Sequence, residues 1–147
     1  MNKKKPVGQN KDLHLIEYTL PGPWTVLVGR TDRANDYLSL KVAKANDYWF
    51  HVRGMPGSHA VLQVPSGQEP DRGTLKRAAA VAAYHSKARE GGVVPVSCTQ
   101  ARFVTKPRGA KPGTVQIRKE FVLKVRPGIV DAFEGETGES PWNIPKA

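Results

Sequence analysis

Basic side chains concentrate in residues 102–126, which hold eight lysines and arginines against a single acid, Glu120. Within this stretch the segment 105–113, TKPRGAKPG, alternates cations with prolines and glycines. Proline fixes φ, and glycine lets the backbone approach a ligand closely. Lysine and arginine on such a preformed loop suit the phosphate backbone of a nucleic acid, although a basic loop without a specific ligand is the alternative. The residues predicted to contact phosphates are Lys106, Arg108 and Lys111.

Aromatic and histidine side chains form a second candidate group in the strand-like run 48–53, YWFHVR. Alternate residues of a strand face opposite sides of a sheet, so Trp49, His51 and Arg53 share one face, and Phe50 and Val52 belong to the core. The first face could stack on bases, as single-stranded RNA recognition often requires. The alternative is a buried Trp49 and a His51 bonded to the backbone. The candidates for base or sugar contacts are Trp49, His51 and His59.

Catalysis is the competing use of the histidines. A hydrolase acting on RNA would need His51, His59 and Asp47 to converge in one cleft. Ser58 and His59 are poorly placed as a nucleophile and base, because neighbours in a strand face opposite sides. The sequence contains no HExxH, CxxC or phosphate-binding GxxxxGK[ST] motif, and the single Cys98 fits a small core position. We therefore predict no catalytic residue, no bound metal and no cofactor.

The elements that position these residues read as mixed strands and helices. The strand patterns cover 24–30, 48–53, 59–64, 93–104, 114–118 and 121–125. Asn35 and Asp36 are good helix N-caps and favour a helix over 37–43, although the same apolar spacing also fits a strand. Capping explains these two residues almost as well as a functional polar role, for which both remain candidates.

The clearest helix pattern spans 74–89, with Thr74 as its expected cap and Gly91-Gly92 after its end. Its apolar positions are nearly all alanine, so this helix can lie close to a sheet. The opposite face is basic. Lys87 and Arg89, near the end of the helix, are expected to extend the phosphate-binding surface.

Length and composition set the limits of the fold. The 147 residues, 39% of them hydrophobic, suit one compact α+β domain with a mixed or antiparallel sheet packed with one or two helices. We expect a basic flexible arm over 1–13, the body over 14–127 and an acidic C-terminal tail over 128–147. The net charge of +10 points to a polyanionic partner. One cysteine excludes an internal disulfide.

Targeting signals are not evident in the sequence. No apolar run approaches the roughly 20 residues of a membrane span, and no apolar stretch follows the lysines at the N-terminus. We therefore expect a cytoplasmic protein without a membrane partner. The sequence does not fix its oligomeric state or the RNA that it would bind.

Several motifs occur together in one order: NDYL at 35–38, DYWFH at 47–51, PGSH at 56–59, the alanine-rich helix ending in SKAR at 86–89, and KPRGAKPG at 106–113. In this order and spacing they resemble the NFACT-R domain, the RNA-binding domain of NFACT proteins, over about residues 20–127. The resemblance implies a non-catalytic module for tRNA or ribosomal RNA, acting at the large ribosomal subunit in translation or ribosome-associated quality control.

The resemblance also has limits. The chain has no room for an NFACT-N domain or a coiled coil, so it resembles a free-standing NFACT-R protein, and tail synthesis on stalled nascent chains is not carried over. Cys98 stands where the family often has an aromatic residue, and Thr105 where it often has a lysine. A further alternative is a module that docks on a ribosomal protein through Trp142 and the acidic tail.

Overall fold

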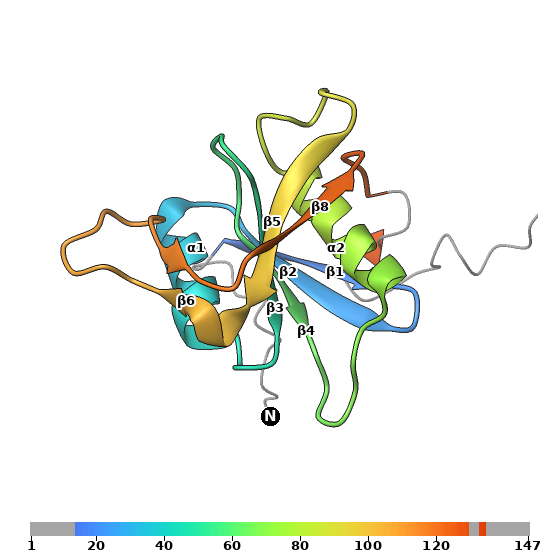
Figure 1. Cartoon of the computed structure of the whole chain (residues 1–147), viewed down its shortest axis with the longest axis horizontal. Helices are drawn as coiled ribbons and strands as arrows, with labels where there is room; N and C mark the ends of the chain where they lie inside the picture. The colour runs from blue at the N-terminus through green and yellow to red at the C-terminus, as the bar shows by residue number, and fades with distance from the viewer. Residues whose placement is uncertain (1–13, 130–132, 135–147) are drawn as a thin grey trace, which may run out of the picture.

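A seven-stranded antiparallel sheet crosses the molecule in the order β8-β5-β3-β4-β2-β1-β9 (Figure 1). The structure is a computed structural model that describes residues 14–129 and the backbone of 133–134. The strands of this sheet are β1 (Leu15–Leu20), β2 (Trp24–Gly29), β3 (Tyr48–Val52), β4 (Ala60–Gln63), β5 (Val94–Gln100), β8 (Phe121–Val125) and β9 (Phe133–Glu134). A separate ribbon pairs β6 (Val104–Thr105) with β7 (Gln116–Ile117). The predicted α+β fold is confirmed.

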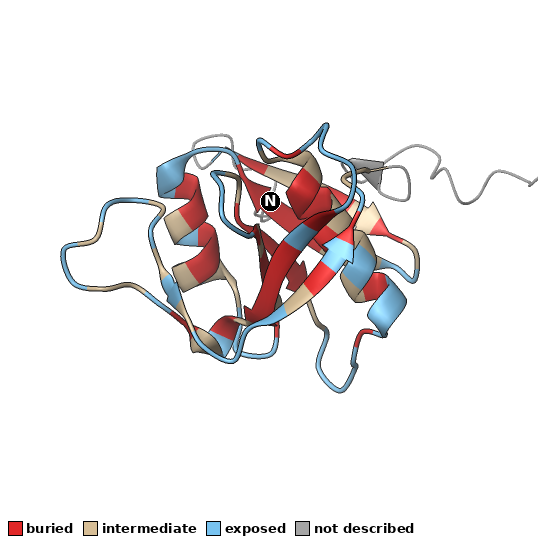
Figure 2. Cartoon of the chain, turned by 45° about the horizontal axis from the view of Figure 1, so that its top comes forward, coloured by how far each residue is buried: buried red, intermediate tan, exposed pale blue. Residues whose placement is uncertain are grey.

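Helix α2 (Arg72–Tyr84) covers one face of the sheet. Its alanines at 78, 79, 82 and 83 are buried, and their small side chains bring the helix backbone close to the strands. Phe50 and Val52 of β3 lie beneath it, which confirms their predicted core role, and so does Cys98. Complete burial of a side chain as large as Phe50 contributes about 2–3 kcal/mol. Figure 2 shows the buried residues along this contact.

The other face of the sheet is covered by α1 (Asp32–Tyr37) and the π-helical turn η3 (Leu38–Val42) that continues it. A smaller core forms here from Leu27, Leu38, Trp49 and Val61, together with Val104 of the β6–β7 ribbon. The helix predicted over 37–43 is therefore confirmed as η3. Because both faces of the sheet are covered, Trp49 lies inside the protein.

The helix caps differ from those expected. The hydroxyl of Thr31 caps α1 by accepting from the amide of Ala34 at 3.0 Å, so Asn35 and Asp36 lie within the helix. Helix α2 begins two residues before Thr74, because the carboxylate of Asp71 accepts from the Thr74 amide at 2.8 Å. This hydrogen bond lowers the pKa of Asp71. The predicted cap of α2 was therefore wrong by three residues, and the caps predicted for α1 were wrong by four and five.

Two strands of the sheet were missing from the sequence interpretation. β1 alternates Leu15, Glu17 and Thr19 with Ile16, Tyr18 and Leu20, and it pairs with the whole of β2. β9 lies in the segment expected to be tail and pairs with β1. The sheet therefore extends past Pro127, whereas Trp142 and the arm at 1–13 lie outside the described residues. The strand predicted over 93–104 ends at Gln100, where the short helix η4 (Ala101–Phe103) begins.

Candidate nucleic-acid interface

The basic loop, residues 106–115 between β6 and β7, projects from the body on the side of α1 (Figure 1). Asp36 holds it there. One carboxylate oxygen of Asp36 accepts from the amide of Gly113 at 2.9 Å, and the other lies 3.0 Å from the ammonium of Lys106. That ammonium also donates to the carbonyl of Lys111 and, at 2.9 Å, to the carbonyl of Thr114.

Lys106 therefore has a different role from the one predicted. Its ammonium is turned inward, and its side chain is only 26% exposed beside an Asp36 side chain that is 23% exposed. Oxygens of three residues, Asp36, Lys111 and Thr114, occupy its donors, which number three in a lysine. Lys106 closes the base of the loop, and a direct phosphate contact from it is not supported by this geometry.

A hydrogen-bonded chain of buried side chains supports the same loop from below. The indole N–H of Trp49 donates to the hydroxyl of Ser39 at 2.9 Å, and that hydroxyl donates to Nδ1 of His59 at 2.8 Å. The Nε2–H of His59 then donates to the carbonyl of Gly113 at 3.1 Å. Since a carbonyl can only accept, Nε2 of His59 carries a proton. The indole N–H also lies 3.4 Å from Nδ1 and can only donate, so Nδ1 is the acceptor and His59 is the neutral tautomer.

Trp49 and His59 are 4% and 3% exposed, and this burial corrects their predicted role. Neither ring can stack on a base in this structure, because α1 and η3 cover that face of β3. His51 is half-buried and stacks on Trp49, with 6.0 Å between the ring centroids. Of the three candidates for base or sugar contacts, Trp49 and His59 instead support the basic loop, and His51 packs against their rings.

Asn35 is likewise buried, and its side-chain oxygen accepts from the amide of His59 at 3.1 Å. A Cβ at Gly29 would lie 2.2 Å from this oxygen, so the close approach of β2 to α1 requires glycine there. Gly113 has φ +89°, and a Cβ on it would lie 3.0 Å from a carboxylate oxygen of Asp32. Gly29 and Asn35 therefore set how closely β2 and α1 approach, and Gly113 sets how closely the basic loop approaches α1.

Burial, and to a lesser extent the neighbouring His51, lower the pKa of His59 to about 4, although the Gly113 carbonyl and Asp36 oppose the shift. In the unfolded chain a histidine has its ordinary pKa near 6.5. Below pH 6.5 the unfolded state therefore takes up a proton that the folded state does not, and stability falls until the pH reaches about 4.

We expect His59 to reduce the free energy of unfolding by about 2 kcal/mol between pH 7 and pH 5. His85, whose pKa burial and two arginines also lower to about 4, adds to the same trend. Urea unfolding at pH 7, 6 and 5 measures the slope. His59→Gln keeps a side-chain donor but cannot titrate, so its slope should be smaller. An unchanged slope in this variant would contradict the assignment. Asp71 does not interfere, because its lowered pKa affects stability only below its ordinary 3.8.

Exposed cations surround this supported loop. Arg108 and Lys111 are both exposed, as are Lys87 and Arg89 after α2 and Arg30 after β2. Arg30, Lys87 and Arg89 line one groove of about 420 Å³, and Lys111 lines a second hollow of about 930 Å³. Asp32 and Thr31 border both, so the two concavities adjoin. We call Arg30, Lys87, Arg89, Arg108 and Lys111 the basic surface.

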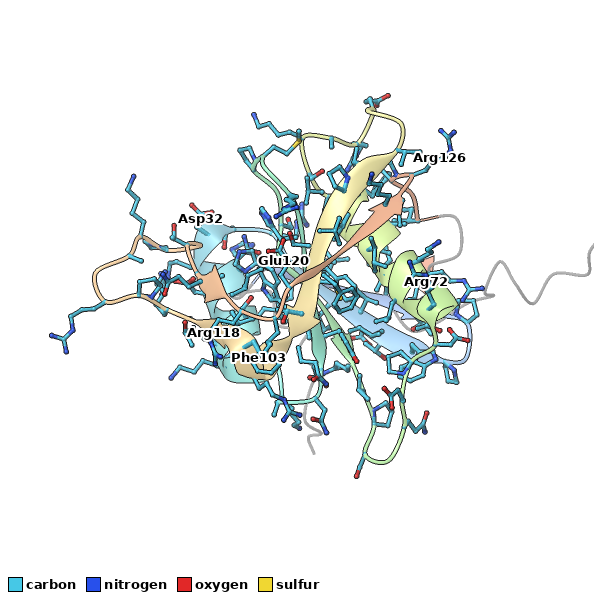
Figure 3. All side chains as sticks on the ribbon, viewed as in Figure 1. Asp32, Arg72, Phe103, Arg118, Glu120 and Arg126 are labelled. Atoms are coloured by element: carbon cyan, nitrogen blue, oxygen red, sulfur yellow. The ribbon has the colours of Figure 1, made fainter. Side chains whose placement is uncertain are left out.

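Arg30 was not among the predicted contacts, because nothing in the run 24–30 distinguishes it from the end of an ordinary strand. Only the fold brings it beside Lys87 and Arg89. Arg118 also belongs to the loop region, but its guanidinium lies over the ring of Phe103 at 5.3 Å and its amide donates to the Phe103 carbonyl (Figure 3). Arg118 therefore strengthens the base of the β6–β7 ribbon.

The catalytic alternative required three side chains to converge. His51 and His59 do approach, with 5.5 Å between ring centroids. Asp47, however, is buried at the start of β3, where its two oxygens accept from the amides of Lys44 and Val64. It lies four residues before His51, or about 13 Å along a strand. The described residues do not assemble the predicted triad. They also include no group of three metal-ligating side chains and no helix long and apolar enough to cross a membrane.

Comparison with known proteins gives one consistent family. The chain is 42% identical over 125 residues to the Rqc2 homolog RqcH of Bacillus subtilis, covering 85% of this chain and 21% of that protein. It is 40% identical over 106 residues to the Rqc2 homolog RqcH of Streptococcus suis, covering 72% of this chain and 19% of the relative. The chain thus spans about a fifth of these curated relatives.

A solved structure is similar as well. The C-terminal part of the fibronectin/fibrinogen-binding protein from Streptococcus suis matches with a TM-score of 0.72 and 34% identity, over 87% of this chain and 47% of that one. A family model described as the NFACT protein RNA binding domain matches residues 16–119, which include the whole of α1, α2 and the basic loop. With this match over most of its length, the chain belongs to the family of NFACT protein RNA-binding domains.

Proposed function

We propose that this protein binds structured RNA, either tRNA or ribosomal RNA of the large subunit, through the basic surface. The observation that carries the proposal is the support of the basic loop by Asp36 and His59, which holds Arg108 and Lys111 outward beside the groove of Lys87 and Arg89. A loop held before binding loses little conformational entropy on binding.

Cations on this surface come from three separate parts of the chain: the end of β2, the segment after α2 and the basic loop. Such a surface can contact phosphates that are distant along one RNA strand but close in its folded form. Phosphate contacts alone do not read sequence, so the proposal assigns the preference to RNA shape. We further propose that the protein acts without catalysis, in the cytoplasm, in ribosome-associated quality control, as its relatives' name suggests.

Fluorescence anisotropy with tRNA, a large-subunit rRNA stem-loop and duplex DNA of equal charge tests the proposal. Each Kd is measured at low and near-physiological salt. We expect at least one RNA to bind about tenfold more tightly than the DNA, with the difference kept at the higher salt. Equal binding of all three that disappears with salt would show that the net charge of +10 acts only as nonspecific attraction.

A further inference from the structure

The groove of about 420 Å³ has walls that are tied to each other. One wall is the turn 56–58 after β3, and the other is the segment 85–89 after α2. The amide of Ser58 donates to the carbonyl of His85 at 2.9 Å, and the amide of Lys87 donates to the carbonyl of Pro56 at 3.3 Å. Gly57 also forms a β-bridge with Ser86. The groove therefore exists before any ligand binds, and its size lies within the range of small-ligand sites.

Arg89 is held in a single arrangement at this groove. Its guanidinium carbon lies 3.9 Å from the centre of the Tyr84 ring, and its Nε donates to the Tyr84 carbonyl at 2.7 Å. The side chain is nevertheless exposed and lines the groove. A guanidinium that rests with one face on an aromatic ring leaves its other face for a second planar group. In RNA recognition that group is an unpaired base.

Two further cations complete the groove. Arg30 enters from the end of β2 and Lys87 from the second wall, and Asp32 is the one acid among the lining residues that the structure describes. His85 lines the groove with the two arginines, and its Nε2 is 2.7 Å from the hydroxyl of Tyr18. Both Arg30 and Arg89 help to lower the pKa of His85, so the two guanidinium groups lie near the same ring. His85 is therefore neutral at pH 7, and the positive charge of the groove comes from Arg30, Lys87 and Arg89.

We propose that this groove binds one unpaired nucleotide of RNA, with its base stacked on Arg89 and its phosphate beside Arg30 and Lys87. The inference rests on the proposed function and makes it more specific. A nucleotide within a duplex cannot enter, because its base is stacked and paired on both sides. A bulged nucleotide can, and it leaves the flanking helix to lie along the cations of the basic loop.

The test uses two RNA hairpins that differ only in whether one nucleotide carries its base. Both carry a single-nucleotide bulge, and in one of them the bulged nucleotide is abasic. The two have equal length, charge and backbone, so their Kd values differ only through the base. We expect the wild-type protein to bind the base-containing bulge about tenfold more tightly, the size typical of one stacked base.

Arg89→Lys separates stacking from charge. It keeps the positive charge but loses the planar group, so it should bind both hairpins equally and leave the salt dependence unchanged. Tyr84→Leu removes the ring beneath Arg89 and should reduce the preference as well. The matched control is Arg72→Lys at the other end of α2, far from Asp32 and the groove (Figure 3), which should keep the wild-type preference. Thermal unfolding confirms that each variant is folded.

The outcomes are distinguishable. Tight binding with equal Kd values for the two hairpins would overturn the nucleotide site and leave the proposed function in place. A preference of Arg89→Lys for the base-containing hairpin as large as that of the wild type would do the same. Failure to bind either hairpin at near-physiological salt would overturn both.

Discussion

Asp36→Asn should weaken RNA binding about tenfold, although it removes a negative charge from a protein that binds a polyanion. The carboxylate of Asp36 accepts from the Gly113 amide and from the Lys106 ammonium. Asparagine offers one oxygen in place of two, and its amide N–H₂ would face one of these donors. The substitution therefore removes at least one of the contacts that hold the basic loop.

Two opposing free energies decide whether Asp36→Asn strengthens or weakens RNA binding. Release of Lys106 could add one phosphate contact, which counterion release makes worth about 1 kcal/mol at physiological salt. Ordering the backbone of a single residue costs about 1–2 kcal/mol. If two residues of the basic loop become mobile, the cost of ordering them again on binding exceeds the gain from the released lysine. A net loss of about 1.4 kcal/mol corresponds to tenfold in Kd.

Anisotropy titration measures the Kd, and amide hydrogen exchange at Gly113 reports whether the loop has loosened. Glu90→Gln is the matched control, because Glu90 is an exposed acid beside Arg89 and its loss changes the net charge equally. The control should bind RNA slightly more tightly. Binding by Asp36→Asn that is as tight as this control would show that the loop is not held by Asp36. Exchange at Gly113 that stays slow would lead to the same conclusion.

Local patterns were sufficient for much of this fold. Alternation in YWFHVR correctly separated Phe50 and Val52 from Trp49, His51 and Arg53, and the alanine spacing identified α2 and its buried face. These signals are local because the side-chain period of a strand or helix is a property of the backbone. β1 was not predicted because both of its faces are partly apolar, so that the alternation of apolar and polar residues is weak.

The site was harder to predict because its contacts are long-range. Lys106 lies 70 residues from Asp36, and Gly113 lies 54 residues from His59. A lysine in a Pro/Gly-rich loop has the same local sequence whether it contacts a phosphate or a carboxylate of its own protein. Trp49 likewise alternates correctly to the face opposite Phe50, and only the packing of Leu38 over that face makes it a core residue. To predict burial on the second face of a sheet, one must know which other elements cover that face.

The outward cations of the basic loop carry the second large effect. We expect the double variant Arg108→Glu/Lys111→Glu to bind RNA about a hundredfold more weakly at near-physiological salt. Each lost phosphate contact costs about 1 kcal/mol there, and each new carboxylate adds repulsion from the RNA backbone. Both positions are exposed and make none of the contacts of Asp36 or His59, so the thermal stability of the protein should change little.

Salt dependence distinguishes direct contacts from a general loss of charge. The slope of log Kd against log salt should decrease by about two, one for each phosphate contact removed. Arg72→Glu/Lys76→Glu, at the start of α2, lowers the net charge by the same four units, from +10 to +6. If this control weakens binding and lowers the slope as much as the loop variant does, the RNA responds to overall charge and the basic loop has no special part. A large effect confined to the loop variant would mean that Arg108 and Lys111 form the principal contact with RNA. Both are exposed on a loop that Asp36, Lys106 and His59 hold in place.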